Sequence, residues 1–547
     1  MENVGPGRHL LKGSTENCED ESIQRNLPTQ GNLRKFRKPF GYSLIVDGEV
    51  VFVTLAAHSS SISVGMTQGY SAVLLPQLGS SDSSLNITKE EASWIASLGV
   101  ISTPFGALLS GILVDVLGRK SAIIITSLPF LVGWLTTAFA TDVLLLYVGR
   151  TVSGFAAGMT AINYLYVSEV SSKEHRSVLS AFGPILVSFG VLVIYTLGFI
   201  TTWERSALVS SAFSALIVVA MILVPESPAW YVSKNKHDEA YESLYWLRRD
   251  AKATETELKH LISSQDDVRD IKDMSKSGKK ISLEKVKDFF KIAKSPEVYK
   301  PFTILIFFFI FQIGSGIYIF LFYATHIFRE FGTDYDENLI TVTIGLFRFL
   351  MAILGAVLMA KIQRRSLGIL SGVCMSLSLL VVCVYQFFAD SMSSTYQFLP
   401  FVSILFHVGF SMTGFLQLPW ILNSELFPLH CRGLLSGLVS CFAYFCIFIA
   451  VKIYWDLLQI LKLDGILWGF FIMSAVGTLF LYFFMPETKD KSLKDISRGF
   501  MKKKSKSTDK GNPVGSQGPT TISVISNDSL KLNPQTILEP SLETVAV

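Results

Sequence analysis

Residues 111–120 read GILVDVLGRK, an apolar run that ends in the basic pair Arg119 and Lys120. A second apolar run ends in KIQRR, residues 361–365, and places Arg364 245 positions after Arg119. An apolar run that stops at clustered arginine and lysine is typical of a membrane-spanning helix where it reaches the cytoplasm. The two matching junctions indicate that the chain contains two related parts.

Two further features recur in the same order along the chain. A glutamate that precedes an arginine by seven residues occurs twice, 256 positions apart, and a Pro-Glu pair followed by a hydroxyl residue occurs twice, 261 positions apart. Three features that return at nearly the same distance predict an internal duplication. The residues concerned are Glu169 and Arg176 with Glu425 and Arg432, and Pro225-Glu226-Ser227 with Pro486-Glu487-Thr488.

The composition is that of a membrane protein. Half of the 547 residues are hydrophobic and only 17% are charged, whereas soluble chains contain about 25% charged residues. This excludes a water-soluble multidomain enzyme and a nucleic-acid-binding or disordered protein, and the net charge of +4 does not indicate a polyanionic partner. A bilayer core needs about 20 apolar residues in a helix. Twelve such stretches occur, at about 49–75, 92–114, 121–140, 144–168, 178–200, 205–224, 301–325, 338–360, 367–389, 397–423, 433–455 and 465–485.

Twelve spans in two related sets predict an all-α membrane protein with the major facilitator fold, two six-helix halves around a solute site at mid-depth. The polar run from His58 to Ser61 lies in the first span and must face a cavity or other helices, because lipid offers hydroxyls no partner. Short amphipathic helices are expected at 239–247, 255–262 and 283–292. The predicted parts are an N-terminal arm (1–44), a first half (45–224), a linker (225–300), a second half (301–486) and a disordered tail (487–547).

The distribution of basic residues predicts the orientation. Lys and Arg concentrate in the loops that would be cytoplasmic, which places both termini inside the cell. The loop between the first two spans then lies outside, where Asn86 begins an Asn-Ile-Thr sequon and is a candidate glycosylation site. None of the six cysteines falls in an outer segment, so neither disulfides nor a metal site are expected.

Acidic and basic residues at the cytoplasmic helix ends are candidates for a gate. A charge-assisted pair contributes about 1.5–3 kcal/mol when it is shielded from water. Several such pairs would tie the halves together in one state and break in the other; the alternative is simple positive-inside charge. The candidates are Glu169 with Arg119 or Arg176, Glu425 with Arg364, Arg365 or Arg432, and in the same set Asp115, Arg150, Glu226 and Glu487.

These motifs resemble those of the sugar porter family of the major facilitator superfamily, in particular the animal glucose facilitators and insect trehalose facilitators. The resemblance covers about residues 45–496 and implies a plasma-membrane carrier of a hexose or trehalose-like sugar, without a cofactor. Matching residues are Gly111 to Lys120, Gly149-Arg150 with Gly154, Tyr166 to Glu169, Pro225 to Pro228, Gln312 with Ser315-Gly316, Pro419-Trp420, Glu425 to Pro428, Arg432-Gly433 and Pro486 to Lys489.

The predicted sugar site departs from the family pattern. The position of the family's sugar-contacting Gln in span five falls near Pro184, and Tyr318 stands where span seven has an Asn. The resemblance places Arg348 where the family has a sugar-contacting Asn, in the middle of span eight, where an arginine is costly and faces a wet cavity or an acid. We expect substrate contacts from Gln312, Tyr318, Tyr323, Arg348 and Trp420.

The resemblance also bears on energy coupling. Proton-coupled members carry an Asp directly after a Gly-Tyr or Gly-Phe pair in span one, whereas Gly69-Tyr70 is followed here by Ser71. We therefore expect proton-independent uniport by alternating access. Two alternatives stay open: a carrier of another organic solute, perhaps an anion because of Arg348, and a nutrient sensor that binds without transport. No catalytic signature supports an enzyme.

Overall fold

The computed structural model describes residues 48–79, 85, 87–172, 175–276, 295–331, 336–388, 396, 398–427, 432–489, 491 and 499–500. Within these ranges it contains twelve helical segments that are long and apolar enough to cross a membrane, as the sequence predicts. The N-terminal arm, the helix expected at 283–292, Asn86 and nearly all of the tail lie outside the described residues.

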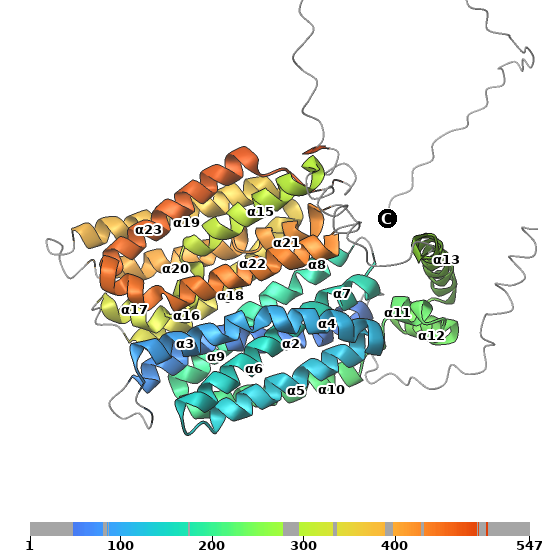
Figure 1. The fold of residues 1–547 in the computed structure, drawn as a ribbon, viewed down its shortest axis with the longest axis horizontal. Helices are drawn as coiled ribbons and strands as arrows, with labels where there is room; N and C mark the ends of the chain where they lie inside the picture. Colours follow the sequence, from blue (N-terminus) through green and yellow to red (C-terminus); the bar gives the residue numbers. More distant parts are fainter. Residues whose placement is uncertain are drawn as a thin grey trace, which may run out of the picture. The chain divides into compact units, whose positions relative to one another are not determined.

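The first six spans form one bundle and the last six another (Figure 1). In the first half, α2 packs on α9, and α5 packs on α6 and α10. Its helices are α2 (Gly48–Leu78), α3 (Lys89–Ile101), α4 (Thr103–Leu117), α5 (Arg119–Ala138), α6 (Val143–Met159), α7 (Ala161–Val170), α8 (Arg176–Ser180), α9 (Phe182–Ile200) and α10 (Trp203–Ile222).

The second half repeats this arrangement, with α19 packed on α20 and α23. Its helices are α15 (Pro296–Gly314), α16 (Ile317–Phe322), α17 (Ala324–Glu330), α18 (Glu337–Lys361), α19 (Arg364–Phe387), α20 (Phe398–Thr413), α21 (Leu418–Glu425), α22 (Arg432–Lys452) and α23 (Tyr454–Phe484). The halves meet where α18 packs on α9 and α22 packs on α3.

The spans are less regular than their apolar runs predict. Span seven is broken between α15 and α16, because Gly316 has a left-handed backbone with φ of 82°, which a residue without a Cβ adopts freely. Span four is likewise divided at Thr160 into α6 and α7. Such breaks are tolerated in a membrane only where the surrounding protein covers the interrupted backbone, and Ser315 and Thr160 are indeed buried.

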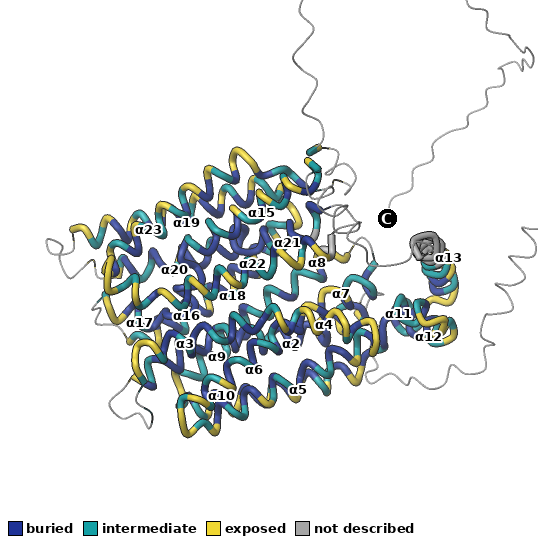
Figure 2. The backbone as a smooth tube through the Cα atoms, in the orientation of Figure 1, coloured by how far each residue is buried: buried dark blue, intermediate teal, exposed yellow. Residues whose placement is uncertain are grey.

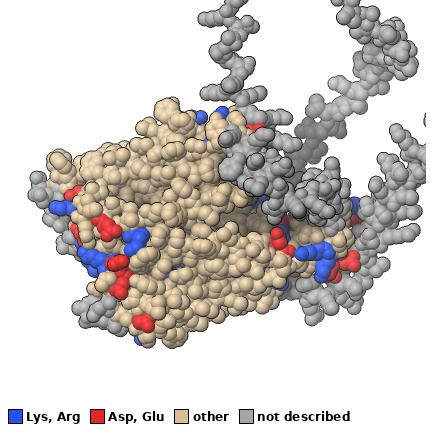
Figure 3. Space-filling view, viewed as in Figure 1, with Lys and Arg blue, Asp and Glu red and all other residues tan. Residues whose placement is uncertain are grey.

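The linker forms α11 (Pro228–Ser233), α12 (His237–Arg248) and α13 (Ala251–Lys276). These helices lie at one end of the first half, where Arg248 donates to the Val170 carbonyl at 3.1 Å and Arg249 pairs with Glu49 at 3.1 Å. We call this the linker end, and the other end, at which Leu78, Lys89 and Glu330 lie, the opposite end. On the visible face, the described Lys, Arg, Asp and Glu residues gather toward the two ends and leave most of the middle uncharged (Figure 3), as a bilayer requires.

The distribution of buried and exposed residues also fits a protein that lies in a bilayer (Figure 2). Large apolar side chains such as Leu108, Ile112 and Leu350 are exposed along the outer sides of the bundle, where lipid would cover them. In contrast, α2 is buried over most of its length. The polar run from His58 to Ser61 is buried against other helices, which confirms the constraint inferred from the sequence.

Candidate functional site

At the linker end of the first half, an arginine–carboxylate ion pair and a helix cap fasten the ends of the spans. Arg119 forms a bidentate ion pair with Glu169, with N–O distances of 2.7 and 2.8 Å. Glu226 accepts hydrogen bonds from the backbone N–H groups of Arg119 and Lys120 at 2.8 and 3.0 Å and so caps the N-terminus of α5. In return, Lys120 Nζ donates to the Val224 carbonyl at 2.8 Å, beyond the end of α10.

The second half repeats these contacts at the positions that the duplication predicts. Arg364 pairs with Glu425, and Glu487 accepts from the backbone N–H groups of Arg364 and Arg365 at 3.1 and 3.0 Å. Lys489, whose counterpart in the first half is Pro228, makes a further contact, to the Ala360 carbonyl at 3.0 Å. Each half therefore fastens its own helix ends with the same ion pair and the same helix cap.

This geometry corrects one expectation. Both ion pairs join helices of the same half, so in the described residues they do not tie the halves to each other. Glu226 and Glu487 act as acceptors for helix N-termini rather than as partners of arginine side chains, because the unsatisfied N–H groups and the helix dipole favour a carboxylate there.

The other residues that the sequence predicts for the gate have different surroundings. Arg365 donates to the Tyr482 carbonyl. Asp115 is exposed, and of its atoms the backbone carbonyl, rather than the carboxylate, accepts from Trp230 at 3.5 Å. Arg176 is exposed and has no ion pair within the described chain. The side chain of Arg432 lies outside the described part.

The pKa values of the two capping carboxylates are shifted in opposite directions. Burial raises the pKa of Glu226 above the ordinary 4.5, although backbone N–H groups act in the other direction. Burial also acts to raise the pKa of Glu487, but four backbone N–H donors, among them those of Lys489 and Arg365, outweigh it and lower the pKa. The difference arises because Glu226 is the more deeply buried of the two.

Arg150 is not part of the linker-end set, which corrects a second expectation. Its side chain is 1% exposed and lies among α2, α3 and α6. It donates to the carbonyls of Thr67 and Ile95 at 3.0 and 3.2 Å and to Ser71 Oγ at 2.9 Å. The guanidinium is thus satisfied by neutral acceptors and holds three helices together.

A narrow cavity between the halves contains Arg348. The cavity is about 10 Å³ and is lined by Tyr195 of α9 together with residues of α16, α18 and α20, including Phe320 and Ser411. Arg348 is 5% exposed, and its Nε has no hydrogen-bond partner among the described residues. A cavity of this size holds at most one water molecule, so the structure is closed around the arginine.

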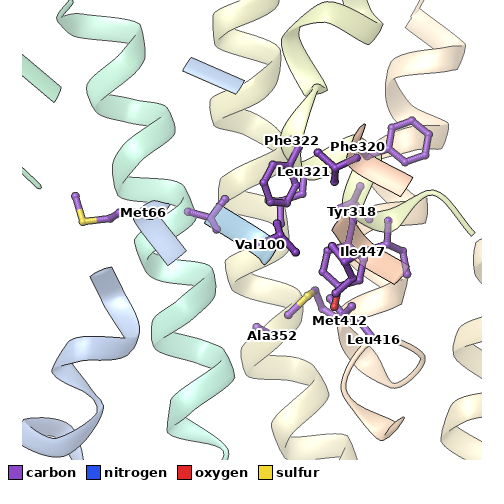
Figure 4. Close-up of a cluster of buried hydrophobic side chains, with 14 of the residues drawn as sticks. Met66, Val100, Tyr318, Phe320, Leu321, Phe322, Ala352, Met412, Leu416 and Ile447 are labelled. Carbon is purple, nitrogen blue, oxygen red and sulfur yellow. The ribbon is translucent and has the colours of Figure 1, made fainter. Parts of the chain in front are cut away.

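Three other predicted substrate-contacting residues lie on the second-half side of the same region: Gln312, Tyr318 and Trp420. Gln312 donates from Nε2 to the Leu416 carbonyl at 2.6 Å, and its Oε1 has no partner in the part of the chain that the structure describes. Trp420 packs edge-on against Phe309 at 4.9 Å and lies 5.3 Å from Tyr444. Figure 4 shows Tyr318 gathered with Met412, Leu416 and Ile447. The arrangement offers aromatic faces and few polar atoms.

Tyr323 lies elsewhere. Its hydroxyl donates to the Val451 carbonyl at 3.0 Å, and its ring stacks on Tyr454 at 4.4 Å. It lines a second cavity, of about 160 Å³, at the opposite end, together with His326 and Trp455. The structure therefore separates Tyr323 from the cavity of Arg348.

The sequence and the fold of the chain are similar to those of known proteins. A family model described as "sugar (and other) transporter" matches residues 40–500. The chain belongs to this sugar transporter family. A facilitated trehalose transporter from Bombyx mori is 31% identical over 450 residues, which cover 82% of this chain and 86% of that protein. One from Apis mellifera ligustica is 30% identical and covers 85% of this chain and 89% of that protein.

Solved structures show the same fold for this sugar transporter. A proton:xylose symporter of the major facilitator superfamily, bound to 6-bromo-6-deoxy-D-glucose, superposes with a TM-score of 0.67 at 19% identity and covers 83% of this chain and all of that chain. The inward-open xylose transporter from E. coli gives a TM-score of 0.64 at 18% identity, and the match covers 82% of this chain and 99% of that chain. The sugar porter resemblance and the twelve-helix major facilitator fold are confirmed, and the protein is a membrane transporter rather than an enzyme.

The sugar transporter contains a polar cluster in which the polar run of the first span meets Asn163, a residue that sequence reasoning missed. Asn163 of α7 donates to Ser60 at 2.7 Å, and His58 Nδ1 lies 3.3 Å from Ser61 Oγ. Within the described ranges, His58 Nε2 and Asn163 Oδ1 have no hydrogen-bond partner. Tyr164 packs edge-on against His58 and is 44% exposed. The signal available in the sequence was His58 and Asn163 inside apolar spans, but only the fold brings them together.

The halves of this sugar transporter touch through hydrogen bonds toward the opposite end. Tyr195 donates to the Leu321 carbonyl at 2.8 Å, and Thr325 donates to the Ala72 carbonyl at 2.9 Å. Lys452 donates to Ser93 at 2.6 Å and lies 4.5 Å from the ring of Trp94. These contacts close the opposite end of the interface between the halves.

Proposed function

We propose that this chain is a facilitative carrier that moves a trehalose- or hexose-like sugar across the plasma membrane by proton-independent uniport. The linker end and both termini would face the cytoplasm. The carrier lies in the lipid bilayer, and the sugar is its small-molecule partner.

The substrate class is supported by the similarity to facilitated trehalose transporters over more than four-fifths of the chain. The cavity region supports it as well, because Tyr318 and Trp420 offer aromatic surfaces for the C–H face of a sugar ring. Arg348 and the free Oε1 of Gln312 supply a donor and an acceptor. A few convergent polar groups in an aromatic-lined site suit a polyhydroxylated solute.

One observation carries the proposal of uniport: Arg150 is satisfied without an acid. Its Nη2 donates to Ser71 Oγ, and its other donors reach backbone carbonyls. Ser71 stands where the family resemblance places an Asp in proton-coupled members. Because serine does not titrate near neutral pH, this contact offers no site at which a proton would be taken up and released.

Alternating access is supported by the contacts between the halves. Tyr195, Thr325 and Lys452 join them toward the opposite end, whereas the linker-end pairs Arg119–Glu169 and Arg364–Glu425 stay within the halves. The halves can therefore rock about mid-depth without breaking either pair. With the linker end in the cytoplasm, the described contacts would close the extracellular side.

Counterflow in proteoliposomes tests the function. Purified protein is reconstituted with unlabelled trehalose or glucose inside, and uptake of the labelled sugar is followed with and without a protonophore. We expect saturable exchange that the protonophore leaves unchanged. Exchange that needs a proton gradient would contradict uniport, and binding without any flux would favour the sensor.

A further inference from the structure

Among the side chains that the structure describes within the spans, two arginines are deeply buried, Arg150 and Arg348, and they differ in one respect. Arg150 has a protein acceptor for each of Nε, Nη1 and Nη2. Arg348 has none at Nε, and no hydrogen bond or ion pair to its guanidinium occurs in the described part of the chain. A guanidinium presents five N–H donors and strongly favours acceptors. The acceptors around Arg150 therefore give it a structural role, whereas the described surroundings of Arg348 offer no such acceptors.

The charge of Arg348 is also without a counter-charge. It lies eleven residues after Glu337 and thirteen before Lys361 on α18, near the middle of the span. Of the described helices that pack most against α18, α9 and α20 contain no acid, and α17 contains Glu330, which is exposed at the opposite end rather than buried beside the arginine. Tyr195, which lines the same cavity, is a phenol that is neutral near pH 7 and provides no counter-charge. An unneutralised cation at this depth is costly, and in membrane proteins such a residue usually marks the path of a substrate or ion.

The position of Arg348 links this charge to the transport path. Its cavity is bounded by Tyr195 from the first half and by Ile317, Phe320 and Leu321 from the second. Tyr195 and Leu321 are also joined by a hydrogen bond that closes the interface at this point. A movement of the halves that breaks this bond would enlarge the cavity and expose the guanidinium to a solute.

We infer that Arg348 binds the carboxylate of a monoanionic, sugar-like solute, so that the preferred substrate is a sugar acid rather than a neutral sugar. The planar guanidinium matches a carboxylate in a bidentate geometry. A carboxylate carries the single negative charge that one arginine neutralises, whereas a phosphate ester carries up to two. The inference rests on the proposed function, because the aromatic surfaces and Gln312 still receive the hydroxylated ring.

The test is counterflow and net uptake of labelled glucuronate, glucose and trehalose in proteoliposomes. The variants are Arg348→Gln, which removes the charge, and Arg348→Lys, which keeps the charge and removes the bidentate fork. Arg205→Gln is the matched control, because Arg205 is exposed at the opposite end and its replacement changes the net charge equally. Monodisperse elution and an unchanged melting temperature show that each variant is folded.

We expect wild type and Arg205→Gln to exchange glucuronate at least tenfold faster than glucose, and Arg348→Gln to lose this preference. Arg348→Lys should retain a reduced preference. Uniport of a monoanion also moves charge: at an inside-negative potential of 100 mV, glucuronate should equilibrate at a concentration about 50-fold lower inside than outside, whereas glucose should equilibrate equally.

Other outcomes separate the two proposals. If wild type exchanges glucose or trehalose but not glucuronate, or if Arg348→Gln keeps the wild-type selectivity, the carboxylate assignment is wrong and the sugar carrier stands. If wild type exchanges none of the three solutes, both proposals fail. If Arg348→Gln is misfolded, the wild-type selectivity and its dependence on membrane potential decide.

Discussion

Arg150 and Ser71 are joined by a hydrogen bond of 2.9 Å from Nη2 to Oγ in the interior of the first half. The arginine is fixed at the same time by the carbonyls of Thr67 and Ile95. Tyr70, the neighbour of Ser71, places its ring 5.8 Å from the guanidinium. The contact therefore joins α6 to α2 through a residue that does not titrate.

The first prediction concerns this contact. Ser71→Asp would place a carboxylate beside Arg150, and an ionised pair in this buried setting would hold α2 and α6 together more firmly. Because Arg150 favours the ionised form of this carboxylate, and a charge-assisted pair contributes about 1.5–3 kcal/mol, we expect sugar uptake by the variant to be low near neutral pH and to rise about tenfold only as the pH falls from about 6.5 to about 4, toward the ordinary pKa of Asp. Uptake by proteoliposomes across this pH range is the measurement.

Ser71→Asn is the control, since it adds a side chain of similar size without a titratable group. Wild type and Ser71→Asn should show flat profiles over the same pH range. A flat profile for Ser71→Asp would mean that this position does not influence the transport cycle.

The second prediction uses the opposite pKa shifts of Glu226 and Glu487. The pKa of Glu487 is lowered in the folded protein, so its contribution to stability is present above pH 4.5 and is lost as the pH falls below that value. The pKa of Glu226 is raised, so its contribution is complete below pH 4.5 and is lost as the pH rises.

Melting temperatures of Glu487→Gln and Glu226→Gln between pH 7 and pH 3.5 check these signs. At pH 7, Glu487→Gln should be less stable than wild type by about 0.5–2 kcal/mol, the usual range for a lost helix cap, and the deficit should shrink in acid. For Glu226→Gln, the stability of the variant relative to wild type should increase as the pH rises. Parallel curves for the two variants would refute the assignment.

The sequence predicts the architecture better than the site. Twelve apolar runs and a duplicated set of charges were enough for the fold, because a bilayer imposes helix length and the repeat imposes symmetry. They did not reveal that Glu226 and Glu487 bind backbone N–H groups, because helix caps are not visible in charge spacing. The surroundings of Arg348 and Arg150 depend on which helices become neighbours, and no local pattern encodes this.

The third prediction concerns the close packing of α6 on α4. A Cβ added at Gly158 would lie 1.9 Å from the Thr103 carbonyl oxygen and 2.9 Å from the Ala107 nitrogen. Both are backbone atoms of α4, so the helices would have to move apart. Gly158→Ala should lower the free energy of unfolding by about 1–3 kcal/mol, the usual cost of overpacking. Thermal unfolding in detergent is the measurement.

Gly111→Ala on the same helix pair is the matched control. No atom lies within 4 Å of a Cβ at Gly111, and alanine is favoured over glycine in a helix by about 1 kcal/mol. This variant should be unchanged or slightly more stable. Equal destabilisation by both substitutions would show that close packing at Gly158 is not the cause.

The fourth prediction concerns Lys452, which joins the halves at the opposite end. Its ammonium donates to Ser93 at 2.6 Å and lies 4.5 Å from the ring of Trp94. A cation–π contact contributes about 0.5–2 kcal/mol, so Lys452→Met should shift the balance between states several-fold toward opening at this end. Hydrogen exchange should become faster in α3 and α22, while α5 and α10, which lie away from the contact, keep their wild-type rates. Lys89→Met removes a cation from the same end and should leave all four helices unchanged. If Lys452→Met also exchanges like wild type, the closure at this end depends on Thr325 and Tyr195 rather than on the lysine.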